Sequence, residues 1–153
     1  MIEPGELLQS YMDEALSCAQ IAYDNGDVPV GAIIVKDGKV IAKAYNRKEK
    51  DLDVLGHAEI LAIKEAVKVT GDWRLNDCTM ICTLEPCPMC AGTMLQARLG
   101  QLVYGAYDLK WGAHSTKLNL LESDQFNHQV DVMYVPDARC SDILTSFFRQ
   151  LRR

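Results

Sequence analysis

Three residues of this chain, His57, Cys87 and Cys90, have the side chains and the spacing of metal ligands. One imidazole and two thiolates supply three of the four ligands that a tetrahedral zinc ion takes. A structural zinc site is normally closed by a fourth protein ligand, whereas a catalytic site leaves that position to water. Glu59 follows His57 by two residues. Zinc lowers the pKa of a bound water to about 7, and a carboxylate at this position could move protons to and from that water. These four residues predict hydrolytic zinc chemistry.

Cys82 leaves a second interpretation of this site open. Nothing in the sequence indicates secretion, and thiols in the cytosol stay reduced, so the six cysteines do not predict a disulfide framework. Core packing is the better interpretation for the cysteines outside the Cys87/Cys90 pair, because a buried free cysteine behaves as a small apolar side chain. Cys82 is the exception, since it could complete a closed Cys3His site and make the chain a non-catalytic zinc module.

The elements that must position these residues alternate between helical and extended patterns. Four segments carry apolar residues at helical spacing: 6–25, 57–69, 88–98 and 137–152. Five runs are rich in strand-forming residues: 28–35, 39–45, 78–84, 102–107 and 130–135. Strands that alternate with helices predict one α/β domain over residues 1–153, with three layers around a single sheet.

Local signals within these segments refine the expected fold. Asp37-Gly38 lies between the first two strands and predicts a hairpin, which makes the sheet mixed. In the last helix we expect the apolar side chains to point inward, namely Ile143, Leu144, Phe147, Phe148 and Leu151. His57 and the Cys87/Cys90 pair each begin a helix on this prediction, and the partial positive charge of a helix N-terminus favours thiolates.

Bulk composition excludes some classes of protein but does not identify a substrate. The first six residues are polar and acidic, which argues against a targeting peptide, and no apolar run reaches the roughly 18 residues that cross a bilayer. We therefore expect a cytoplasmic protein without a membrane partner. The net charge of −5 is not typical of a nucleic-acid-binding protein. Local basic groups, such as the one around Arg47 and the one at the C-terminus, are usually only solvated faces.

The order His-x-Glu and then Pro-Cys-x-x-Cys is the signature of the zinc-dependent nucleobase deaminases. Beyond this motif, the chain resembles the bacterial tRNA-specific adenosine deaminases (TadA) along nearly its whole length. The segments that carry the resemblance are Val28-Pro29-Val30-Gly31-Ala32, Asn46, His57–Ile60, Thr83–Gly92, Val103-Tyr104-Gly105-Ala106, Asp108, Asn127-His128 and Phe147-Phe148-Arg149. Cytosine, guanine and deoxycytidylate deaminases share the zinc motif, so a deaminase of a free base or nucleotide remains the alternative.

This resemblance implies a fold, a reaction and partners. The family has the cytidine-deaminase-like fold, an α-β-α sandwich around a mixed five-stranded sheet, and works as a homodimer with one Zn²⁺ per subunit. The implied reaction is hydrolysis of adenosine to inosine at the wobble position of a tRNA anticodon, with tRNA-Arg as the expected substrate. Water in the open position would be the nucleophile, and Glu59 would transfer the protons.

The resemblance also implies a set of substrate contacts. The residues that would contact the flipped base, line its pocket or border the zinc are Asn46, Val28, Pro29, Val30, Thr83, Leu84 and Glu85. Those that would meet the ribose, the flanking nucleotides and the phosphates of the anticodon stem are Ala106, Tyr107, Asp108, Arg149, Arg152 and Arg153.

Two segments depart from the family pattern, namely 52–56 and 111–116. Neither contains a zinc ligand or Glu59, so the expected chemistry is unaffected. Trp111 and His114 lie in the second segment, near the expected RNA-facing loop. The indole of Trp111 could stack on a base, a contact worth about 1–3 kcal/mol, or it could be a lid over the core; the sequence leaves both open.

Overall fold

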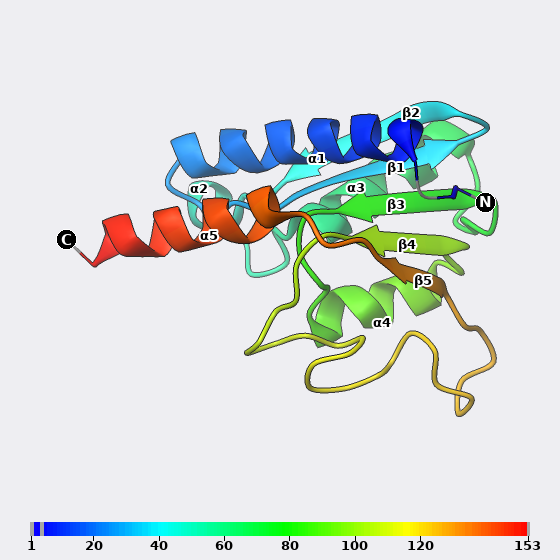
Figure 1. Cartoon of the computed structure of the whole chain (residues 1–153). Helices are drawn as coiled ribbons and strands as arrows, with labels where there is room; N and C mark the ends of the chain where they lie inside the picture. Colours follow the sequence, from blue (N-terminus) through cyan, green and yellow to red (C-terminus); the bar gives the residue numbers. More distant parts are fainter. Residues whose placement is uncertain (1, 4, 153) are drawn as a thin grey trace.

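A computed structural model describes residues 2–3 and 5–152 of the chain. Its central feature is a five-stranded sheet between two layers of helices, as Figure 1 shows. In chain order the elements are α1 (Glu6–Asp24), β1 (Gly31–Lys36), β2 (Lys39–Tyr45), α2 (Lys48–Asp51), α3 (Ala58–Thr70), β3 (Cys78–Cys82), α4 (Pro88–Gln96), β4 (Gln101–Tyr104), β5 (Asp131–Tyr134) and α5 (Ala138–Leu151). No helix among the described residues is long and apolar enough to cross a membrane.

The sheet is mixed, as the sequence predicts. Its strand order is β2-β1-β3-β4-β5. Strand β1 is antiparallel to both β2 and β3, whereas β3, β4 and β5 run parallel. Asp37 and Gly38 form the two-residue hairpin loop, and both have a positive φ (52° and 74°), as the tight turns that suit twisted strands require. The α-β-α sandwich with a mixed five-stranded sheet is therefore confirmed.

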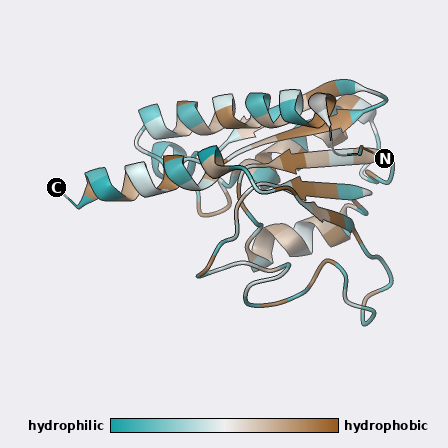
Figure 2. Cartoon of the chain, in the orientation of Figure 1, coloured by the Kyte–Doolittle hydropathy of each residue, from teal (hydrophilic) through white to brown (hydrophobic). Residues whose placement is uncertain are grey.

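Each face of the sheet has its own hydrophobic core. Ala32 and Ile34 of β1 point toward the layer of α3 and α4, and the intervening Ile33 points toward α1 and α5. The strands are correspondingly brown over much of their length in Figure 2, while teal residues gather along α1 and α5. Helix α1 approaches β1 so closely at Gly31 that a Cβ there would collide with the backbone oxygen of Ala15, so glycine is required at this position.

The segment before β1 differs from its predicted structure. The sequence pattern predicted a strand from Val28, but the strand begins at Gly31. Pro29 has no N–H to donate to a neighbouring strand, and the N–H of Val30 bonds to the carbonyl oxygen of Val28 (2.9 Å), which folds the segment into a tight turn.

Strands β3 and β4 also end earlier than predicted, at Cys82 and Tyr104, because the chain turns there toward the loops that carry the candidate site.

A short helix, α2, was not predicted. The buried carboxylate of Asp27 accepts hydrogen bonds from the backbone N–H groups of Glu49 (2.7 Å) and Lys50 (3.1 Å), which lie 22 and 23 residues further along the chain. The helix ends at Leu52, which adopts a left-handed conformation with φ 51°. The local sequence does not reveal this helix because the group that holds its first turn is distant in the chain.

The prediction that the apolar side chains of α5 point into the core is only partly right. Phe147 is buried, but Phe148 and Leu151 are 41% and 64% exposed. Figure 1 shows the reason: the C-terminal part of α5 extends beyond the sheet, on the side to which β3 and β4 point, so its apolar side chains have no sheet beneath them.

Candidate active site

The three predicted metal ligands come together at the N-termini of two helices. His57 is the N-cap of α3, Cys87 is the N-cap of α4, and Cys90 lies in the first turn of α4 after Pro88. The Nδ1 atom of His57 is 3.6 Å from the Sγ atom of Cys87 and 3.5 Å from that of Cys90. A tetrahedral zinc with Zn–S near 2.3 Å and Zn–N near 2.05 Å would separate such donors by about 3.6 Å. The donor set and its spacing therefore fit zinc.

Cys82 does not complete a closed site. Among the residues that the structure describes, the metal-binding cluster consists of His57, Cys87 and Cys90, whose donor atoms lie within 4.8 Å of one another. Cys82 is fully buried in β3, and burial raises the pKa of its thiol well above the usual value. This geometry favours the core-packing interpretation of Cys82 and leaves the fourth position of the site without a protein ligand in the described chain.

The environment of Cys87 favours a thiolate. The hydrogen bond with the Cys90 thiol is the main cause, and together with the interaction with His57 it lowers the pKa of Cys87 to about 4, although burial opposes the change. A deprotonated sulfur is the form that binds a metal.

Glu59 lies in the first turn of α3, and its side chain is buried. Burial is the largest influence on this carboxyl group and raises its pKa to about 7, against the opposing effect of its own backbone N–H group and of the nearby Cys90 and His57. A carboxyl group in such a place can exchange protons with a bound substrate.

Asn46 connects the predicted base pocket to the metal cluster. Its Oδ1 atom accepts a hydrogen bond from the backbone N–H of Ala58 (2.8 Å), the residue that follows His57. Its backbone N–H donates to the carbonyl oxygen of Val30 (3.1 Å), beside the buried Pro29 and the half-buried Val28. The bond to Ala58 orients the Asn46 side-chain amide and leaves its NH₂ group free of that bond.

Thr83, Leu84 and Glu85 link β3 to the cluster. The Thr83 hydroxyl accepts a hydrogen bond from the Gly31 N–H (3.2 Å) inside the protein, and Leu84 is half-buried. Glu85 is buried too, with an exposed fraction of only 1%.

The Glu85 carboxylate organises a distant loop, a role that the sequence did not indicate. It accepts hydrogen bonds from five donors, namely the backbone N–H groups of Asp108, His114, Ser115 and Thr116 and the hydroxyl of Thr116. Although burial opposes ionisation, these donors lower the pKa of Glu85 below its usual value. Gly112 passes so close that a Cβ there would collide with the carboxylate.

The remaining predicted contacts near β4 differ in their exposure and in their local partners. Ala106 is buried, and the exposed ring of Tyr107 lies against Tyr134, with centroids 4.0 Å apart. The Oδ1 atom of Asp108 accepts hydrogen bonds from the N–H groups of Lys110 and Trp111 (both 3.1 Å).

The arginines predicted to meet the RNA stem are not part of the metal cluster. Arg149 and Arg152 are exposed at the end of α5, and Arg153 lies outside the described residues.

Comparisons with known proteins identify the family to which this site belongs. A model of the MafB19-like deaminases matches residues 8–152. The chain is 45% identical over 144 residues to a tRNA-specific adenosine deaminase of Bacillus subtilis, an alignment that covers 94% of this chain and 89% of the relative. The chain belongs to the tRNA-specific adenosine deaminase family.

Solved structures agree with this membership. One, from a study of A-to-I editing by tRNA:A34 deaminases at the wobble position of transfer RNA, is 37% identical with a TM-score of 0.85, over 89% of this chain and 99% of that one. A guanine deaminase from Nitrosomonas europaea superimposes with a TM-score of 0.78 over 96% of this chain and 86% of that one. It is only 20% identical, so this second likeness concerns the fold alone.

In this member of the tRNA-specific adenosine deaminase family, a chain of hydrogen bonds holds segment 111–116, which departs from the family pattern. The sequence did not predict these bonds. The Tyr104 hydroxyl lies 2.8 Å from Nδ1 of His114, and Nε2 of His114 lies 2.7 Å from the carboxylate of Glu122. His114 therefore ties the loop to the end of β4. Trp111, in the same loop, is 65% exposed, which favours a side chain open to a partner over a lid on the core.

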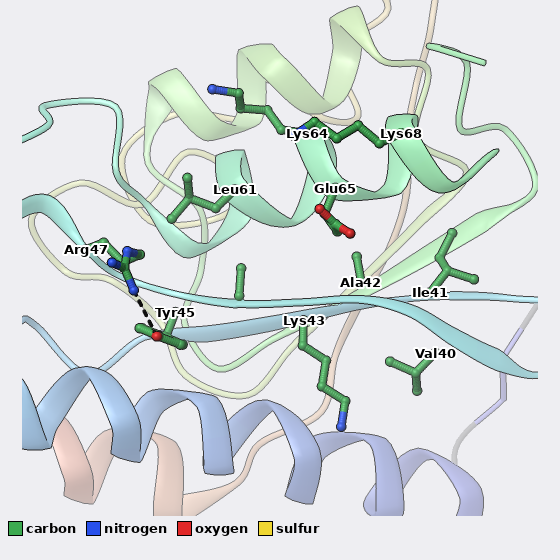
Figure 3. Close-up of a pocket in the computed structure, with 11 residues that line it drawn as sticks. Val40, Ile41, Ala42, Lys43, Tyr45, Arg47, Leu61, Lys64, Glu65 and Lys68 are labelled. Carbon is green, nitrogen blue, oxygen red and sulfur yellow. Dashed lines mark hydrogen bonds between the residues drawn. The ribbon is translucent and has the colours of Figure 1, made fainter. Parts of the chain in front are cut away.

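A separate groove of about 580 Å³ follows the edge strand β2 and the facing side of α3. Figure 3 shows Lys43, Arg47 and Glu65 among its lining residues. None of the metal ligands and none of the predicted substrate contacts lines it. The groove is therefore separate from the cluster of His57, Cys87 and Cys90.

Proposed function

We propose that this chain hydrolyses adenosine to inosine at the wobble position of a tRNA anticodon, with tRNA-Arg as the expected substrate. The observation that carries the proposal is the convergence of His57, Cys87 and Cys90 beside the buried Glu59. The relative from Bacillus subtilis, described as a tRNA-specific adenosine deaminase, supports adenosine in tRNA as the substrate.

His57, Cys87 and Cys90 would hold the zinc ion, which supplies Lewis acidity that makes water nucleophilic near neutral pH. Hydrolytic deamination also requires a proton at the purine ring nitrogen and another on the departing ammonia. Glu59 serves these transfers in our proposal, because its carboxyl group lies beside the cluster in a position sheltered from solvent. Asn46, whose Oδ1 is held by Ala58, would direct its NH₂ group to the base.

An anticodon loop suits a site in which the reacting base must reach a metal ion. A base must leave its stack to reach the metal, and this costs least where the base is already unpaired, as in an anticodon loop. Arg149, Arg152 and Arg153 would meet the phosphates of the stem, which contribute affinity without sequence information. We further propose that the enzyme works as a homodimer, which the family resemblance supports and which sedimentation velocity would test.

The decisive experiment measures inosine in a transcribed tRNA-Arg anticodon stem-loop with adenosine at the wobble position, in parallel with free adenosine, guanine and cytosine. We expect conversion of the stem-loop alone. Moving the adenosine to another position of the loop provides the matched control and should abolish conversion. Deamination of a free base with no reaction on the stem-loop would overturn the RNA assignment and support a guanine or cytosine deaminase.

A further inference from the structure

The loop that follows β4 displays large side chains beside the metal cluster. Tyr107, Leu109 and Trp111 are 44%, 75% and 65% exposed. The loop is bonded to the segment that leads to Cys87, because the N–H of Ala113 donates to the carbonyl oxygen of Pro86 and the N–H of Glu85 donates to that of Ala106 (both 2.9 Å). The exposed side chains are therefore next to the proposed reaction site.

The backbone of this loop is fixed before any ligand binds. The Glu85 carboxylate accepts hydrogen bonds from backbone N–H groups at both ends of the segment 108–116. The Asp108 carboxylate accepts a hydrogen bond from the N–H of Trp111 (3.1 Å). The Tyr107 ring is held against Tyr134. An exposed indole on a preorganised backbone loses little conformational freedom when it binds a partner.

Trp111 is not covered by a ring or a cation in the part of the chain that the structure describes. The other tryptophan, Trp73, is 50% exposed, and the Arg74 guanidinium covers its ring at 4.5 Å from the centroid. Across the described residues, no aromatic ring or cation packs against Trp111 in the same way. A largely exposed indole on a hydrogen-bonded backbone next to the candidate site is a surface suited to stacking.

We propose that Trp111 stacks on an unpaired nucleotide adjacent to the one that is deaminated. This inference rests on the proposed function, since it takes a single-stranded RNA loop as the occupant. The exposed Lys110 and Lys117 on the same loop favour a polyanion over an apolar protein surface. Stacking of one base on an aromatic side chain corresponds to about 5- to 150-fold in affinity.

Steady-state and single-turnover kinetics of the zinc-loaded enzyme on the stem-loop test this role. Trp111→Ala should raise KM about 10-fold or more, and Trp111→Phe should recover much of the loss because a smaller ring still stacks. The single-turnover rate at saturating stem-loop should stay unchanged, since Trp111 does not contact the reacting atoms. Trp73→Ala is the matched control: it removes an exposed tryptophan beyond the far end of the 13-residue helix α3, about 20 Å from His57, and should change neither value.

Fluorescence provides a readout that is independent of catalysis. The chain has two tryptophans, so Trp73→Phe leaves Trp111 as the only indole. Binding of the stem-loop should quench its emission, whereas a stem-loop with an abasic site beside the target adenosine should quench it less. Wild-type affinity in Trp111→Ala, or equal quenching by both RNAs, would overturn the stacking role while leaving the deaminase assignment intact.

Two further outcomes distinguish the rival explanations. If the wild-type enzyme converts no stem-loop at all, the proposed function fails before the role of Trp111 is reached. If Trp111→Ala instead shifts the sedimentation coefficient toward a lighter species, the side chain belongs to a contact between copies of this chain, and the stacking proposal is wrong.

Discussion

At the scale of single residues, the proposed chemistry depends on the carboxyl group of Glu59. Glu59→Gln keeps the size of the side chain but removes its ability to accept a proton. We expect inosine formation on the stem-loop to fall by about 10²- to 10⁴-fold, the usual contribution of a positioned acid or base. Zinc should remain bound, because His57, Cys87 and Cys90 are unchanged, and metal analysis of the purified protein checks this.

Glu65 provides the control for that substitution. It lies on the same helix, α3, but its side chain is exposed and lines the groove beside β2. Glu65→Gln should therefore leave the rate of inosine formation at its wild-type value. Wild-type activity in Glu59→Gln would show that another group moves the protons.

At the scale of elements, Glu85 determines how the stability of the loop 108–116 depends on pH. Hydrogen-bond donors around the carboxylate lower its pKa in the folded protein relative to about 4.5 in the unfolded chain. The Glu85 carboxylate therefore stabilises the fold fully at pH values above its unfolded-state pKa. This stabilisation is lost as the pH falls through the lower pKa that Glu85 has in the folded protein. Glu85→Gln leaves several partly buried donors poorly satisfied, which we expect to cost about 1–3 kcal/mol near neutral pH.

The measurement is thermal unfolding of both proteins between pH 7 and about pH 3. The difference in Tm should be constant above about pH 5.5 and should shrink below about pH 4.5, because the Glu85 carboxyl group then becomes protonated first in the unfolded chain and, at lower pH, in the folded protein. Glu49→Gln, a change at an exposed carboxylate on α2, should have little effect on Tm at any pH. A difference between wild type and Glu85→Gln that does not vary with pH would contradict the proposed role.

At the scale of the whole molecule, a metal held by the cluster would join two helices of one layer. His57 begins α3, and Cys87 and Cys90 belong to α4, so a bound ion links these elements to each other. At free zinc of 1,000 times Kd, binding stabilises the folded state by about 4 kcal/mol. For a chain of 153 residues this corresponds to a rise in Tm of about 8–16 °C.

Chelation followed by differential scanning calorimetry tests this linkage. Tm should fall on removal of zinc and return when zinc is added back. The far-UV circular dichroism should change little, because both cores of the sheet are made by apolar packing. Loss of zinc without a change in Tm would contradict a structural link between α3 and α4 through the ion.

Local sequence patterns were enough to predict the His57, Cys87 and Cys90 cluster and most of the elements. His57, Glu59, Cys87 and Cys90 were predictable because they lie in short motifs at helix starts, where local spacing decides which atoms face the same point. The mixed sheet could also be inferred from local patterns, since Asp37-Gly38 indicates the hairpin and apolar periodicity indicates the helices.

Tertiary structure decided how the surrounding loops are held. The bonds from Glu85 to the loop 108–116, from Asp27 to α2 and from Tyr104 through His114 to Glu122 join residues 8 to 31 positions apart. The exclusion of Cys82 from the metal cluster and the exposure of Trp111 likewise depend on where whole elements pack. A local pattern reports the spacing within one element, whereas these contacts exist only after the elements have come together.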